Sequence, residues 1–317
     1  MSSSTYVHGS SEKDEHVGYK DDAEYVRSSW TLCLKSRKNM KRITVVMRSA
    51  ERMDRVFGNT WISTEKWWTK VHPTDLNVPK DITLHPMEYL FNPPITNIGK
   101  YSTQLVYRAL RNRGVDAPTI YCSPTLRTVQ TAMCIAKTNE AKICIEPGLV
   151  EPVEWYRFGG AQYMPDFRGS YGLSHAIDQS YKPIFALEEI ELGFATKTQE
   201  QCIQRIMFVL RNICGQQRDH PAIIIGHAIT MDIASRIGQH GDNIEEDRKD
   251  EYTSYEDPIY SCDVNNRSQK LDLGVRYPPG SVMALRRVND SPPYVLETVP
   301  NIIPPLTAGL CTNKIAH

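Results

Sequence analysis

The sequence predicts an α/β fold in which helices cover both faces of a mostly parallel sheet, giving a three-layer α/β/α sandwich. Short runs of β-branched and other apolar residues recur along the chain, and segments with helical periodicity separate them. With 317 residues, of which 40% are hydrophobic, the chain is long enough to bury the core of one large α/β domain.

Five strands are expected as short apolar runs, and the first of them is of the kind found in buried parallel sheets. They cover residues 43–47, 119–122, 143–145, 222–225 and 281–285. The helices are expected where apolar side chains recur on one face, at residues 100–113, 199–214, 229–237 and after Ser123-Pro124. Gly114 is placed to stop the first helix, and Ser123 resembles the N-cap of the helix that follows it.

The chain is expected to form one domain after a polar tail. Residues 1–40 are poor in large apolar side chains and are predicted to be disordered, whereas residues 41–317 form the domain. Two long stretches, at about 58–94 and 152–196, interrupt the strand and helix pattern and are predicted to be inserted cap or lid segments. The charged stretch at 242–257 is predicted to be a solvated loop.

Composition excludes several classes of function. The 37 Lys and Arg residues balance the 37 Asp and Glu residues, which argues against broad binding to nucleic acid or to an anionic membrane. No apolar run approaches a membrane span, and no signal peptide begins the chain, so a cytosolic or nuclear protein is expected. The eight cysteines form no zinc pattern, and no Walker loop, G-x-G-x-x-G or G-x-S-x-G motif occurs. No metal or cofactor is therefore expected.

Polar residues follow the predicted strands at their carboxyl ends, where α/β sheets bind ligands. Arg48 and Arg52 follow the first strand, Arg127 follows the second, Glu151 follows the third, and His227 follows the central one. Arginines that converge on one rim would form a cationic pocket able to hold a dianion with bidentate hydrogen bonds.

The residues after the first strand resemble a known signature. Arg48-Ser49-Ala50-Glu51-Arg52 is similar to the R-H-G-E-R motif of the histidine phosphatase superfamily, in its phosphoglycerate-mutase-like branch. The resemblance is closer still to the phosphatase domain of the ubiquitin-associated and SH3-containing proteins, also called suppressors of T-cell receptor signalling. It extends from about residue 41 to the C-terminus through further spaced motifs, among them R-M-D-R-V-F-G-N-T-W, Y-C-S-P-T-L-R, E-P-G-L and I-G-H-A.

The resemblance implies both a fold and a mechanism. In such enzymes the histidine of the first motif attacks phosphorus, arginines and a second histidine clamp the phosphoryl oxygens, and a carboxylate protonates the leaving group. Carried over, the clamp is Arg48, Arg52, Arg127 and His227, with Glu151 as general acid. The nucleophile position is occupied by Ser49.

Ser49 decides the functional prediction, because a serine hydroxyl is a weak nucleophile without an adjacent base. Ala50 also replaces the glycine of the motif. The sequence therefore predicts a pseudophosphatase in a signalling setting, which binds a phosphorylated ligand or a protein partner. One alternative is an active phosphatase on phosphotyrosine proteins or small phosphomonoesters. Another is an unconventional serine phosphatase in which His227 acts as the base for Ser49. Cys122, at C-x4-R spacing from Arg127, is one residue short of a cysteine-phosphatase loop and is better explained as a buried strand residue.

A further alternative is a dimeric scaffold that ignores phosphate, since the resemblance implies a homodimer. Trp61, Trp67 and Trp68 could line a phosphotyrosine pocket, although packing beneath a lid explains them as well.

Overall fold

The computed structural model describes residues 37–58, 61–63, 68–69, 75–80, 86–152, 157–158, 161–162, 164–194, 196–216, 219–240, 273–299 and 302. The predicted polar tail, apart from its last four residues, and the predicted charged loop at 242–257 lie outside these residues. No helix in the described part of the chain combines the length and the apolar character that a membrane crossing requires.

The described residues contain a six-stranded mixed sheet in the order β10-β9-β1-β8-β4-β5. Four strands, β1, β8, β4 and β5, pair in parallel, and β9 and β10 extend this sheet through antiparallel pairs. The bounds are β1 Ile43–Arg48, β4 Thr119–Cys122, β5 Lys142–Ile145, β8 Ala222–Gly226, β9 Val282–Arg287 and β10 Leu296–Thr298. The mostly parallel sheet predicted from the sequence is thus present.

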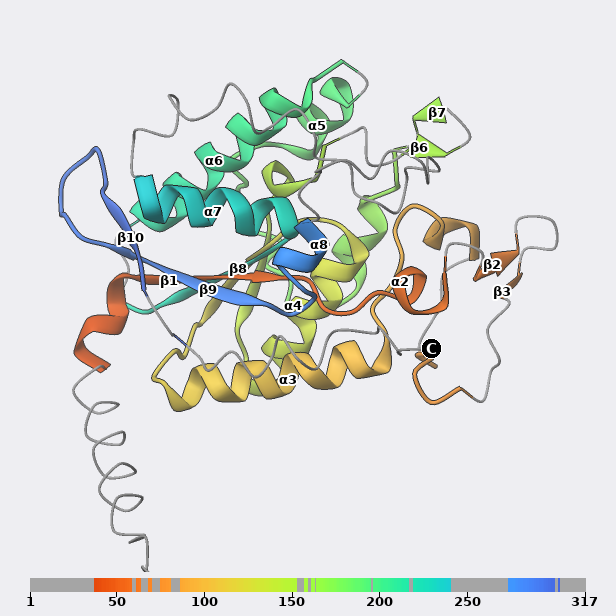
Figure 1. Cartoon of the computed structure of the whole chain (residues 1–317), viewed down its shortest axis with the longest axis horizontal. Coiled ribbons are helices and arrows are strands. Elements are labelled where there is room, and N and C mark those ends of the chain that lie inside the picture. The colour runs from red at the N-terminus through yellow and green to blue at the C-terminus, as the bar shows by residue number, and fades with distance from the viewer. Residues whose placement is uncertain are drawn as a thin grey trace, which may run out of the picture.

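Helices cover both faces of this sheet (Figure 1). On one face, α3 and α4 pack against alternate residues of β1 such as Val45 and Met47. On the other face, α6 and α7 pack against Val46 and Ile224. The side chains of successive strand residues point to opposite faces, which is why one strand supplies both cores. The bounds are α2 Met53–Phe57, α3 Asn97–Asn112, α4 Leu126–Asn139, α5 Leu187–Gly193, α6 Gln199–Gly215, α7 Ala228–His240 and α8 Leu273–Arg276.

Local sequence signals predict one helix end correctly and one helix start wrongly. Thr96 caps α3 by accepting a hydrogen bond from the backbone N–H of Gly99 at 2.9 Å, and Gly114 follows the helix with a φ of 88°. The prediction that Ser123 caps the next helix is wrong. This helix, α4, begins at Leu126 with Thr125 as the N-cap residue. The backbone N–H of Leu126 donates instead to the side chain of Asn92 at 2.7 Å, so a distant residue satisfies the helix start.

The stretches predicted to be inserted segments hold only small elements among their described residues. The first contains the pair β2 Ile62–Ser63 and β3 Trp68–Thr69, and the second contains the pair β6 Arg157–Phe158 and β7 Ala161–Gln162, as well as α5. Trp61 is buried in a small cluster with Met53, Ile62 and Tyr89, which supports packing rather than ligand contact for this tryptophan. Short 3₁₀ turns complete the described elements at Arg37–Arg42, Pro86–Tyr89, Pro147–Leu149 and Arg168–Gly172.

Strand register brings three chain segments to one edge. Arg48 at the end of β1 lies beside Gly226 at the end of β8, and Cys122 at the end of β4 lies beside Ile225. Because the three strands are parallel and adjacent, the residues that follow them emerge next to one another. The sheet thereby positions the predicted site at its carboxyl edge.

Candidate functional site

Backbone hydrogen bonds anchor the loop after β1. The N–H of Ser49 donates to the carbonyl of Gly226 at 2.9 Å, and the carbonyl of Ser49 accepts from Gly280 at 3.2 Å. The N–H of Ala50 donates to Thr131 Oγ1 at 3.1 Å, which ties the loop to α4. These bonds hold Ser49 at the carboxyl end of the central strands, where the residue is almost fully buried.

The two arginines of this loop have different partners. Arg52 forms a bidentate ion pair with Asp54, with Nε–Oδ1 and Nη2–Oδ2 distances of 2.9 and 2.7 Å. Arg48 donates through Nη1 to the backbone carbonyl of Tyr277. Both guanidinium groups are buried, so the pairing offsets part of the cost of removing their charges from water.

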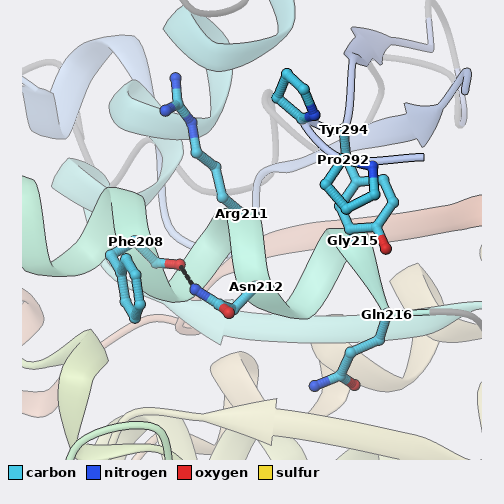
Figure 2. A pocket seen from close by; sticks show the side chains of 8 residues that line it. Phe208, Arg211, Asn212, Gly215, Gln216, Pro292 and Tyr294 are labelled. Carbon is cyan, nitrogen blue, oxygen red and sulfur yellow. Dashed lines mark hydrogen bonds between the residues drawn. The ribbon is translucent and has the colours of Figure 1, made fainter.

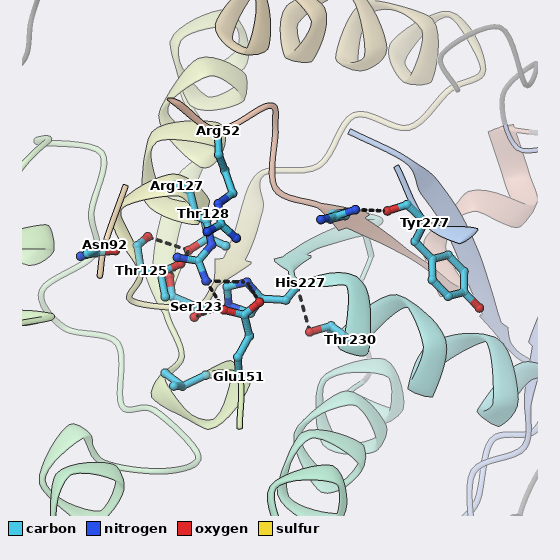
Figure 3. Close-up of polar contacts among 12 residues, drawn as sticks. Arg52, Asn92, Ser123, Thr125, Arg127, Thr128, Glu151, His227, Thr230 and Tyr277 are labelled. Carbon is cyan, nitrogen blue, oxygen red and sulfur yellow. Dashed lines mark hydrogen bonds and ion pairs between the residues drawn. The ribbon is translucent and has the colours of Figure 1, made fainter. Parts of the chain in front are cut away.

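Arg127 lies in the first turn of α4 and projects into the interior of the site. It is 1% exposed, and its Nη2 forms an ion pair with Oε2 of Glu151. The other carboxylate oxygen of Glu151, Oε1, lies 3.3 Å from Nδ1 of His227. Glu151 therefore bridges the arginine and the histidine, as Figure 3 shows.

His227 follows β8 at a tight turn into α7. A Cβ atom on the preceding residue, Gly226, would lie 2.5 Å from Thr230 Oγ1, so only glycine fits at this turn. The backbone N–H of His227 donates to the same Oγ1 at 3.1 Å. On the ring, Nδ1 lies 3.4 Å from Arg127 Nη2, and Nε2 lies 3.0 Å from Ser123 Oγ. Both ring nitrogens thus face residues other than Ser49.

The electrostatics of the site keep His227 neutral. Complete burial, followed by the positive charges of Arg127, Arg52 and Arg48, lowers the pKa of His227 well below its ordinary value of 6.5. All three predicted arginines are thus close enough to influence the imidazole. A neutral imidazole carries one N–H donor and one acceptor nitrogen, so it can bind an anion by hydrogen bonding without adding charge.

The six predicted site residues therefore gather at one edge of the sheet, but the charge of the site differs from the prediction. Arg127, Glu151 and His227 touch directly, whereas Tyr277, whose backbone carbonyl accepts from Arg48, lies to one side of them (Figure 3). The predicted strongly cationic pocket is less cationic than expected, because carboxylates pair with two of its three arginines.

Two residues that contact the site were not assigned from the sequence. The spacing of Asp54 could have indicated its pairing with Arg52, because it follows that arginine by two residues. No spacing could have indicated the contact between Ser123 and His227, because the two residues lie 104 positions apart.

The structure also bears on the cysteine alternative. Cys122 is fully buried at the end of β4, and burial raises the pKa of its thiol, followed by a smaller effect of Cys144. A thiol held in its protonated form is a poor nucleophile. Cys122 is a core residue, as predicted.

A groove lies apart from this site, between the C-terminal end of α6 and residues 292–294 (Figure 2). Its volume is about 410 Å³, and Phe208, Arg211 and Tyr294 are among its lining residues. The end of α6 precedes the start of β8, so the groove lies toward the opposite edge of the sheet. None of the six predicted site residues lines it.

Comparison with known proteins agrees with this geometry. The family model described as Histidine phosphatase superfamily (branch 1) matches residues 89–248 of the 317-residue chain. The match covers just over half of the chain and includes Arg127, Glu151 and His227. The chain belongs to the histidine phosphatase superfamily. The matched residues begin after the first motif, so the comparison with that motif rests on the resemblance of residues 48–52.

The chain is similar in sequence to two curated relatives. The chain is 31% identical to ecdysteroid-phosphate phosphatase of Drosophila melanogaster over 203 residues, which are 60% of this chain and 26% of that protein. It is 30% identical to human ubiquitin-associated and SH3 domain-containing protein B over 206 residues, which are 61% of this chain and 31% of that protein. The chain thus spans less than a third of the length of these relatives.

A solved structure extends the similarity to the fold. The crystal structure of the ecdysone phosphate phosphatase of Bombyx mori, in complex with tungstate, superposes with a TM-score of 0.57 at 25% identity. The superposition covers 83% of this chain and 94% of that one. The predicted phosphoglycerate-mutase-like α/β fold is therefore confirmed.

Proposed function

We propose that this chain is a pseudophosphatase domain, which binds a phosphoryl group at the edge formed by β1, β8 and β4 but does not transfer it to a histidine. The proposal rests on the resemblance of residues 48–52 to the first motif of the superfamily, in which Ser49 takes the position of the nucleophilic histidine. The ligand is a phosphorylated small molecule or a phosphorylated protein partner.

The surroundings of Ser49 support the loss of nucleophilic function. A serine hydroxyl needs a base that removes its proton, and both nitrogens of His227 are directed to Ser123, Glu151 and Arg127. The methyl group of Ala50 packs with Ile95 and Cys134, so the position of the motif's glycine has become part of the core. No general base for Ser49 follows from these contacts.

The surroundings of Arg127 support retained binding. Its guanidinium, the neutral imidazole of His227 and the nearby charge of Arg52 offer several donors to one tetrahedral anion. Glu151 contacts both Arg127 and His227 of this donor set. A bound phosphoryl group would replace the carboxylate as the acceptor. The solved relative that holds tungstate, a tetrahedral oxyanion, is consistent with such a ligand.

Calorimetric titration with orthophosphate and orthovanadate tests the binding half of the proposal. The wild-type chain should bind both anions, and Arg127→Ala should weaken binding about 10- to 100-fold, the value of one charge-assisted contact. Arg127→Lys keeps the charge but loses the planar fork, so its affinity should be intermediate. Arg111→Ala is the matched control, because this exposed arginine lies at the far end of α3 and pairs with Asp116.

The outcomes separate the alternatives. Binding that Arg127→Ala weakens and Arg111→Ala does not supports the proposal. Absence of binding to either anion would contradict it and favour a scaffold that ignores phosphate. Hydrolysis of p-nitrophenyl phosphate that disappears in Arg127→Ala would contradict it in the other direction and favour an active phosphatase.

A further inference from the structure

Two grooves meet along the exposed side of α6. The groove at the C-terminal end of this helix has a volume of about 410 Å³ (Figure 2). A second groove, of about 450 Å³, follows the N-terminal half of the helix. Phe208 and Arg211 line both, so the two form one continuous surface, called the α6 groove, which runs from Lys197 to Tyr294. None of the six predicted site residues is among its lining residues.

The length of the α6 groove suits an extended peptide. The residues of α6 that line it run from Gln201 to Gly215. At a rise of about 1.5 Å per helical residue, this stretch is about 21 Å long. An extended chain covers about 3.3 Å per residue, so about six or seven peptide residues would fill the groove.

Arg205 offers a hydrogen-bond donor to a ligand in this groove. It is 9% exposed, its Nε donates to the carbonyl of Gly148 at 3.1 Å, and its Nη2 donates to the carbonyl of Val150 and to Cys202 Sγ. Within the part of the chain that the structure describes, Nη1 makes no hydrogen bond and stays solvent-accessible, and no carboxylate pairs with this guanidinium. A cation that is nearly buried and offset only by carbonyl and thiol dipoles favours a carboxylate as its next partner.

The other lining residues add apolar surface and further positive charge. Phe208 is 54% exposed, and its ring packs edge-on against Phe185 with the ring centroids 5.9 Å apart. Tyr294 and two prolines close the C-terminal end (Figure 2). Lys197 and Arg211 are the further cations, and no Asp or Glu is found among the described lining residues. The groove thus combines positive charge with an exposed aromatic surface.

We propose that the α6 groove binds an acidic peptide segment of a partner protein, with a carboxylate on Arg205 and an apolar side chain against Phe208. Charge complementarity selects this occupant, because an acidic side chain would meet cations and no competing carboxylate of the described lining. An exposed aromatic ring beside an arginine is also the kind of pair that dominates the affinity of protein interfaces. The groove lies apart from the phosphoryl-binding edge, so the inference goes beyond the proposed function and does not depend on it.

Fluorescence anisotropy of a labelled heptapeptide tests the proposal on the full chain. The probe carries three glutamates at one end and a leucine and a phenylalanine at the other. A second probe has the reverse order, because the groove does not fix the direction of the peptide, and a third has glutamines in place of the glutamates. The chain should bind one acidic probe with a dissociation constant of about 10 μM, and the glutamine probe at least about tenfold more weakly. Saturating orthophosphate should not displace the acidic probe.

Substitutions in the groove locate the binding. Lys197→Gln should weaken it about threefold, the effect of one partly exposed charge, and Phe208→Ala about tenfold through lost apolar contact. Arg205→Gln should weaken it most. Lys137→Gln and Tyr101→Ala are the matched controls, because these exposed residues lie on α4 and α3, across the sheet from α6. Lys197 and Phe208 are not buried, so their variants decide the test even if Arg205→Gln fails to fold.

Four results would overturn the inference. The first is that neither acidic probe binds the wild-type chain. The second is binding that Lys197→Gln and Phe208→Ala both leave unchanged. The third is displacement of the probe by orthophosphate, which would place the peptide at the phosphoryl-binding edge. The fourth is a wild-type dimer in analytical ultracentrifugation that Phe208→Ala converts to monomer, since a second copy of the chain would then be the occupant of the groove.

Discussion

Burial of His227 predicts a specific dependence of stability on pH. The folded protein keeps this imidazole neutral, because burial and the charges of Arg127, Arg52 and Arg48 lower its pKa well below 6.5. Its other neighbours are Glu151 and Ser123. In the unfolded chain the same group protonates near pH 6.5. Below that pH the unfolded chain therefore binds one more proton, and acid favours unfolding.

The expected size follows from proton linkage. The free energy of unfolding should fall by about 1.36 kcal/mol per pH unit below pH 6.5 because of this one group, or about 2 kcal/mol between pH 6.5 and 5. His227→Gln cannot protonate, so its stability should change less steeply over that interval, whatever its absolute value.

Urea unfolding monitored by circular dichroism at half-unit steps from pH 5 to 7 measures both slopes. The exposed His220 serves as a control, and His220→Gln should keep the wild-type slope within error. A His227→Gln slope equal to that of wild type would refute the conclusion that the folded protein holds this histidine neutral.

Three other substitutions have effects that follow from buried contacts. Asp54→Ala leaves Arg52 buried without its bidentate partner and should lower the free energy of unfolding by about 3 kcal/mol in urea; a loss below about 1 kcal/mol would contradict the buried pairing. Glu151→Gln removes the negative charge that competes with an anion for Arg127, so orthophosphate should bind about tenfold more tightly in calorimetry, and equal or weaker binding would contradict that competition. Glu146→Gln loses part of a carboxylate that accepts from one hydroxyl and three backbone N–H groups, and its thermal unfolding midpoint should fall by several degrees, whereas an unchanged midpoint would argue against this anchoring role.

Much of the sheet and its helices was predictable because those signals are local. The apolar run at 43–47 became β1, and the apolar face at 199–214 became α6, which a Thr198 cap begins. The strand β10 was missed, because Leu296–Thr298 is a short edge strand with only one buried residue. Edge strands bury little, so their sequences carry little alternation of apolar and polar residues.

The site was predictable in its location but not in its contacts. The positions of Arg48, Arg127 and His227 at or just after strand ends indicated that they belong to the site, because neighbouring parallel strands bring their carboxyl ends together. The carboxylate partners were not foreseen, since ion pairing depends on side-chain directions that spacing does not fix. Ser123 was wrongly predicted to cap a helix, because a serine after a strand is a common local signal for a helix cap. Its hydroxyl contacts His227 instead.

Turnover of p-nitrophenyl phosphate tests the central claim most directly, with wild type compared to Ser49→His and to Ser49→His combined with Ala50→Gly. The claim predicts that wild-type turnover equals that of Arg127→Ala, and that restoring histidine at position 49 raises turnover well above this level. Wild-type turnover that disappears in Arg127→Ala would contradict it, whether or not Ser49→Ala also removes the activity, because the chain would then be an active phosphatase.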